Sequence, residues 1–68
     1  MLLRDYTKSE LDYFIEYCNF TDRELQYFLL KSKDFSNVKI SMEMFISEQQ
    51  VSRLARRVKN KIDRVQKS

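Results

Sequence analysis

The sequence contains no histidine, and this excludes several kinds of catalytic and metal site. No serine or cysteine can be activated by a neighbouring imidazole, and a zinc site would have to rest on Cys18 together with carboxylates. Glycine is also absent, which excludes the phosphate-binding loops of the Walker and Rossmann kinds. The ten Asp and Glu residues are interspersed with Lys and Arg, as on a solvated surface. We therefore expect no enzyme, no catalytic residue, no metal site and no cofactor.

Cysteine is scarce, because Cys18 stands alone and cannot form an internal disulfide, of which small secreted domains usually need several. Cys18 has helical spacing from Leu11, Phe14 and Ile15, which predicts a buried thiol rather than a nucleophile. The longest apolar run, residues 27–30, is far shorter than the roughly 18 residues that span a bilayer. The amino terminus also lacks the pattern of a signal peptide. We expect a cytoplasmic protein with no membrane partner.

Charge is divided unevenly along the chain. The net charge is +3, yet residues 1–35 hold five basic and seven acidic side chains, whereas residues 36–68 hold eight basic and three acidic ones. Between residues 53 and 67 seven basic side chains face a single acid, Asp63. Such a density favours a polyanionic partner such as nucleic acid, and a merely solvated helix surface is the alternative.

Apolar spacing and capping residues predict four helices and no strand. The expected helices are residues 8–18, 21–31, 37–44 and 47 to the carboxyl terminus. Three of them begin with a capping box, in which Thr7, Thr21 or Ser47 is followed three residues later by Glu or Gln. The last helix is about 28 Å long, more than so small a core can cover. Part of its apolar stripe should therefore pack on the first helix or on a second copy of the chain.

Apolar positions indicate which helix faces are buried. In the second helix apolar residues, Leu29 among them, cover most of the circumference, so we expect this helix at the centre. In the third helix Val38, Ile40 and Met44 are expected to point inward, with Met42 as a further candidate. The inward stripe of the last helix is Val51, Leu54, Ala55, Val58, Ile62 and Val65.

Residues 37–54 have the spacing of a helix-turn-helix. Such a motif needs inward residues in both helices, an apolar residue in the turn and a small residue where the helices approach most closely. Ser41 is the small residue. The inward positions are Ile40, Met44, Ile46, Val51 and Leu54.

This pattern resembles the LuxR-type and sigma-factor region 4 family of helix-turn-helix proteins. The opening Phe20-Thr21-x-Arg23-Glu24 is followed by Ile40-Ser41-x-x-Met44-x-Ile46-Ser47-x-x-x-Val51-x-x-Leu54. The resemblance covers residues 20–62 and implies a DNA-binding domain.

One residue departs from the family pattern, since Phe45 stands in the turn where the family usually has glycine. A bulky residue in left-handed conformation costs about 1 to 2 kcal/mol unless the turn is reshaped. The whole chain is expected to be a single all-α helix-turn-helix domain over residues 1–68. In it residues 1–19 form an amino-terminal helix packed on the motif, and residues 63–68 form a carboxyl-terminal tail.

The outward face of the last helix suggests how DNA would be read. The amino-terminal part of a recognition helix reaches deepest into the major groove, where Gln pairs with adenine and Arg with guanine. The expected base contacts are Gln49, Gln50, Ser52 and Arg53. The expected phosphate contacts are Lys39, Arg56, Arg57 and Lys59. The expected partner is double-stranded DNA, bound by a transcription regulator or a DNA-binding accessory factor.

A protein-interaction module without DNA readout is the alternative. Region 4-like domains of the resembling family also contact RNA polymerase, and Tyr6, Tyr13 and Tyr17 could form an aromatic contact surface. Burial in a homodimer would explain these tyrosines equally well. No pocket for a small-molecule ligand is evident from the sequence.

Overall fold

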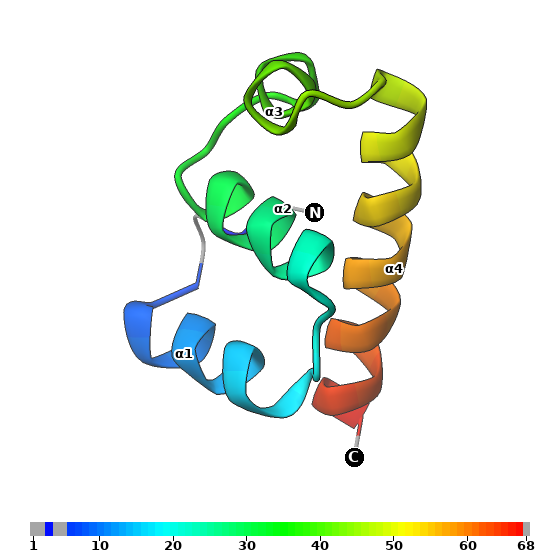
Figure 1. Ribbon diagram of the computed structural model, residues 1–68. Coiled ribbons are helices and arrows are strands. Elements are labelled where there is room, and N and C mark those ends of the chain that lie inside the picture. The colour runs from blue at the N-terminus through cyan, green and yellow to red at the C-terminus, as the bar shows by residue number, and fades with distance from the viewer. Residues whose placement is uncertain (1–2, 4–5, 68) are drawn as a thin grey trace.

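The computed structural model describes Leu3 and residues 6–67, which form four α-helices joined by short turns and contain no strand (Figure 1). The helices are α1 (Lys8–Tyr17), α2 (Asp22–Ser32), α3 (Asn37–Met44) and α4 (Glu48–Lys67). The all-α class and the long carboxyl-terminal helix are thus confirmed. Outside the described residues lie Met1, Leu2, Arg4, Asp5 and Ser68. They include most of the amino terminus on which the expectation of no signal peptide rests, and the last residue of the predicted tail.

Helix α4 lies along one side of the molecule and contacts each of the other three helices (Figure 1). Its residues Val51, Leu54, Val58 and Ile62 are buried and recur every three or four positions, which places them on one face. Helices α2 and α3 cover the first part of this stripe, and α1 packs near its carboxyl-terminal end. Helix α1 therefore covers the part of the buried stripe of α4 that α2 and α3 do not cover.

Aromatic rings fill the centre of the core. Phe28 of α2 is fully buried, and its ring centroid lies 6.5 Å from that of Phe14 and 5.0 Å from that of Phe20. Because Phe20 directly precedes the capping residue of α2, this contact fixes the angle at which the chain enters the helix. Cys18 is buried in the same cluster, as predicted. Burial raises the pKa of its thiol although the charge of Lys61 acts in the opposite direction, and a raised pKa favours the neutral thiol over the thiolate.

Side chains cap the amino end of every helix. The Thr21 Oγ1 atom accepts from the Glu24 N–H at 3.3 Å, and the Thr21 N–H donates to Glu24 Oε1 at 3.0 Å. The predicted boxes at Thr7 and Ser47 have the same two reciprocal bonds. In α3 the hydroxyl of Ser36 accepts from the third backbone N–H at 3.2 Å. Replacing such a cap by alanine costs about 1 kcal/mol, so these residues define where the helices begin.

Three turns need a left-handed residue, and without glycine they use Asn19, Asp34 and Phe45. Asn and Asp tolerate this conformation, whereas Phe45 has φ 56° and ψ 43° with its side chain 93% exposed. The N–H of Ile46 donates to the Ser41 carbonyl at 3.1 Å, and that of Phe45 to Met42 at 3.4 Å. These bonds form a Schellman motif. The turn is therefore not reshaped, and phenylalanine adopts the conformation that glycine would have.

Some of the predicted inward positions are wrong. Val38 and Met42 of α3 are 53% and 64% exposed, and Leu29 of α2 is 44% exposed. Helix α3 is only eight residues long and its buried residues are Ile40 and Ser41, so the opposite face is exposed in the part of the chain that the structure describes. In α2 the buried residues lie on one face, and Leu29 lies outside it.

None of the helices within residue 3 and residues 6–67 is both long and apolar enough to cross a bilayer.

Candidate nucleic-acid interface

Helices α3 and α4 cross steeply, because α3 is seen almost end-on in the view that shows α4 along its length (Figure 1). Ser41 lies buried at the crossing, where its hydroxyl donates to the Val38 carbonyl at 2.6 Å. Ile40 of α3 and Val51 of α4 are fully buried in the same core cluster. The segment from residue 37 to residue 54 is therefore a pair of crossed helices joined by a tight turn, as the spacing predicts.

All eight residues predicted to contact DNA are exposed. Seven of them come from α4, where they occupy the face opposite the buried stripe and its two flanks, and they are Gln49, Gln50, Ser52, Arg53, Arg56, Arg57 and Lys59. Lys39 is the eighth and comes from α3, with its Nζ atom 4.3 Å from the centroid of the Phe35 ring. The structure thus brings the seven α4 residues together on one helix and leaves Lys39 apart, held over an aromatic ring.

Gln50 also takes part in the capping box at the start of α4, and this restricts its use as a base contact. Its side-chain Oε1 accepts from the Ser47 N–H at 3.3 Å, and its own backbone N–H donates to the Ser47 hydroxyl at 3.1 Å. A bidentate contact to adenine needs both the oxygen and the amide nitrogen of the side chain. While the cap is formed, only the amide nitrogen of Gln50 is free to donate.

An arginine from α2 joins the flank of α4 that contains Gln50. Arg23 lines a shallow hollow together with Gln50, Arg53, Leu54 and Arg57. Arg23 could have been noticed from the sequence, because a cation in the first turn of a helix opposes the helix dipole and is unfavourable there. Local helix stability does not explain a positive charge at this position. Arg23 instead joins Arg53 and Arg57 in one group of cations on the surface.

A comparison with protein families agrees with this geometry. The family described as bacterial regulatory proteins, luxR family, matches residues 18–66. The chain belongs to this family. Among curated proteins and solved structures no match was found. The LuxR family consists of DNA-binding regulatory proteins, so at family level this chain is a DNA-binding transcription regulator. The match includes α2, α3 and nearly all of α4, and leaves α1 outside.

One basic residue of the LuxR-family helix α4 is structural. Lys61 forms an ion pair with Glu24, whose side chain is 4% exposed, and also donates to the Asn19 carbonyl at 3.2 Å. Burial alone would raise the pKa of Glu24, but hydrogen bonds from Lys61 and Thr21 and the charge of Lys61 lower it below its ordinary value. Lys61 therefore ties the amino end of α2 and the turn before it to α4.

Four other cations lie on the exposed face of α4, and the described residues supply no carboxylate to pair with them. Within residue 3 and residues 6–67, none of Arg53, Arg56, Arg57 and Lys59 forms an ion pair with a carboxylate. A row of unpaired cations on one helix attracts the phosphates of a nucleic acid.

In the part of the chain that the structure describes, no three side chains of the His, Cys, Asp or Glu type come close enough together to hold an ion.

Proposed function

We propose that this LuxR-family chain binds double-stranded DNA sequence-specifically by placing the amino-terminal half of α4 in the major groove. The observation that supports this most directly is the solvent-exposed face of α4, whose cations have no carboxylate partners among the described residues. An α-helix with its side chains is about 10 to 12 Å across, close to the width of the major groove. The helix can therefore lie in the groove with residues on both flanks near a phosphate backbone.

Individual roles follow from the positions along α4. Gln49, Ser52 and Arg53 point away from the core near the helix start and contact base edges, with Arg53 suited to guanine. Gln50 contributes through its amide nitrogen alone, because its oxygen caps the helix. The phosphate contacts are Arg56, Arg57 and Lys59, with Lys39 added from α3. Such a protein acts as a transcription regulator or an accessory factor in the cytoplasm, where its DNA is found.

Binding measured over a salt series tests the proposal. A preferred site is first selected from random duplex DNA, and affinity is then measured by fluorescence anisotropy at several salt concentrations. The logarithm of affinity should fall linearly with the logarithm of salt concentration, with a slope near −0.9 per phosphate contact. The absence of duplex binding even at low salt would refute the proposed function.

Two arginine variants distinguish contacts to bases from contacts to phosphates. Arg53→Ala should lower the preference for the selected site over unrelated DNA, with a loss of about 1 to 3 kcal/mol confined to the selected site. Arg57→Ala should weaken binding to both DNAs alike and reduce the salt slope by about 1. Lys8→Ala is the matched control, because it removes one exposed cation at the start of α1. If the two arginine variants behaved identically, the assignment of roles would be wrong.

A protein-interaction function is the second candidate, and exposed tyrosines favour it. Tyr13 and Tyr17 on α1 are 49% and 57% exposed, and their ring centroids lie 4.6 Å apart. Tyr6 differs, because it is half-buried with its ring 5.1 Å from that of Phe14. The exposed pair would suit RNA polymerase or a second copy of the chain. Light scattering of the protein with and without DNA tests the homodimer, and Tyr13→Ser with Tyr17→Ser should abolish any dimer observed.

A further inference from the structure

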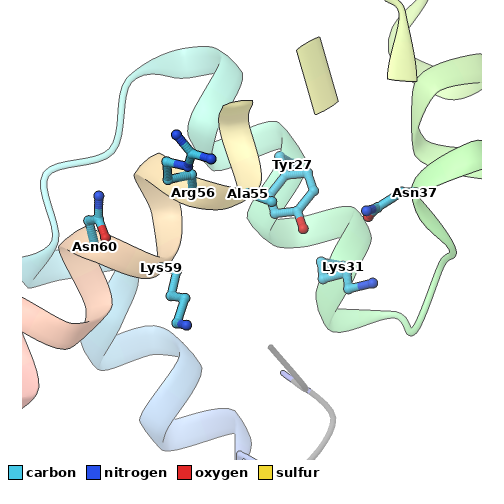
Figure 2. A pocket seen from close by; sticks show the side chains of 7 residues that line it. All are labelled: Tyr27, Lys31, Asn37, Ala55, Arg56, Lys59 and Asn60. Atoms are coloured by element: carbon cyan, nitrogen blue, oxygen red, sulfur yellow. The ribbon is translucent and has the colours of Figure 1, made fainter. Parts of the chain in front are cut away.

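A second hollow lies on the other flank of α4, and its lining is unusual for a protein surface. It is formed between α2, the start of α3 and the middle of α4, with Ala55 on the α4 side (Figure 2). The polar residues that line it are Tyr27, Lys31, Asn37, Arg56, Lys59 and Asn60. None of these described residues is acidic, so every charge that they bring to the hollow is positive.

Tyr27 is the most informative of these residues. The residue is only 1% exposed, yet its hydroxyl points into the hollow (Figure 2). Among the described residues the hydroxyl has no hydrogen-bond partner. No fully buried side-chain nitrogen or oxygen among the described residues lacks a partner, so this hydroxyl is open to the hollow, and a tyrosine hydroxyl in such a place usually finds a hydrogen-bond partner. Burial also raises the pKa of Tyr27, so the group stays protonated at neutral pH and is available as a donor.

The cations around the hollow are similarly available. Among the described residues, no carboxylate forms an ion pair with Lys31, Arg56 or Lys59. The ammonium of Lys31 donates to the Phe35 carbonyl at 3.4 Å, which leaves two of its three protons for another acceptor. Asn37 is the first residue of α3, where the helix dipole adds further positive potential. Donors and positive charge thus surround one small space.

The position of this hollow relative to α4 identifies the source of the anion. Lys59 lines this hollow and Arg57 lines the one beside Arg23, and residues two apart on a helix lie on nearly opposite flanks. Gln49 and Arg53 lie on the face between the two flanks. A helix in the major groove has a phosphate backbone on each side. The two hollows lie where those two backbones would run.

We infer that the hollow lined by Tyr27, Lys31, Asn37 and Lys59 binds a phosphate of the DNA backbone, with the Tyr27 hydroxyl as a hydrogen-bond donor. This inference rests on the proposed function and adds residues of α2 and α3 to the interface. The anion fills the hollow on one side of the recognition helix, while Arg23 and Arg57 face the backbone on the other side. The two sets hold α4 at a fixed depth and tilt in the groove.

Tyr27→Phe is the sharpest test, because it removes the hydroxyl and keeps the ring. The hydroxyl has no partner within the described protein, so the thermal stability of the free variant should equal or exceed that of the parent. Its affinity for duplex DNA should fall about tenfold, the loss of one hydrogen bond to a charged group. Lys31→Ala should reduce the slope of the salt series by about 0.9. Lys8→Ala, which removes an exposed cation that does not line the hollow, should change the slope much less.

Each outcome separates this inference from the proposed function. If duplex DNA is bound but Tyr27→Phe and Lys31→Ala leave affinity and salt slope unchanged, the hollow takes no backbone phosphate and the proposed function stands. If no duplex is bound by the parent protein, both fail. A titration with inorganic phosphate, followed by amide NMR shifts of Lys31 and Asn37, addresses a free anion as the source. Shifts in that titration together with unchanged DNA affinity of the variants would overturn the assignment to DNA.

Discussion

Replacement of Phe45 by glycine should stabilise the protein. Phe45 has a left-handed backbone with φ 56°, which costs a residue with a Cβ atom about 1 to 2 kcal/mol relative to glycine. Its side chain is 93% exposed, so its removal loses little apolar burial. Glycine loses more backbone entropy on folding, roughly 0.5 to 1 kcal/mol. The net gain is therefore between about 0 and 1.5 kcal/mol, which raises the Tm of a domain of this size by up to about 12 °C.

Thermal unfolding followed by circular dichroism measures this gain, and Phe45→Ala is the matched control. Alanine also removes the aromatic ring but keeps the Cβ atom, so its Tm should stay near that of the parent. If the alanine and glycine variants were stabilised equally, exposure of the ring rather than backbone conformation would be the cause. A glycine variant less stable than the parent would show that the ring contributes to packing and that the reasoning is wrong.

Two further predictions concern the core. The pKa of Glu24 is lower in the folded protein than its unfolded value of about 4.3, so its contribution to stability is present above that pH and is lost as pH falls through the folded pKa. Urea unfolding between about pH 3 and 7 should therefore show the stability gap between the parent and Glu24→Gln closing at the acidic end; a constant gap would contradict this. Phe28→Ala should cost about 3 to 5 kcal/mol, enough to abolish cooperative unfolding of so small a domain, whereas Leu29→Ala, at the exposed neighbouring position, should cost far less. Equal losses from both, measured by urea unfolding, would refute the burial pattern of α2.

Helix boundaries were predictable because their causes are local. The side chains of Thr7, Thr21 and Ser47 each satisfy a backbone N–H three residues away, so the sequence shows the cap without reference to the rest of the chain. The inward stripe of α4 was predictable for a similar reason, since a 20-residue helix repeats its buried position many times. The face of α4 that carries Gln49 and Arg53 follows directly from that stripe.

Burial in α3 was less predictable, because a helix of eight residues with apolar side chains on several faces has no clear stripe. Which of Val38, Ile40 and Met42 is covered depends on where α2 and α4 lie. The contributions of Arg23 and Lys31 to the interface depend likewise on the packing of α2 against residues about 30 positions later in the chain. Helical periodicity cannot reveal such a juxtaposition.

Lys61 illustrates the same limit within the basic run. Its charge and spacing resemble those of Lys59, and only its pairing with Glu24, 37 residues earlier, distinguishes a structural cation from one that faces solvent.

The unbroken length of α4 has a mechanical consequence. Helix α1 packs near the carboxyl-terminal end of α4, through the core cluster that contains Phe14. Gln49 and Arg53 lie near the amino-terminal end of the same helix. Ile62 and Gln49 are about 20 Å apart along the helix axis at 1.5 Å per residue. A small change in the angle of α4 at Ile62 would therefore move Gln49 by an ångström or more. The direction of the amino-terminal end of α4 is therefore set by packing along the whole helix, against α2 and α3 near that end and against α1 near the other.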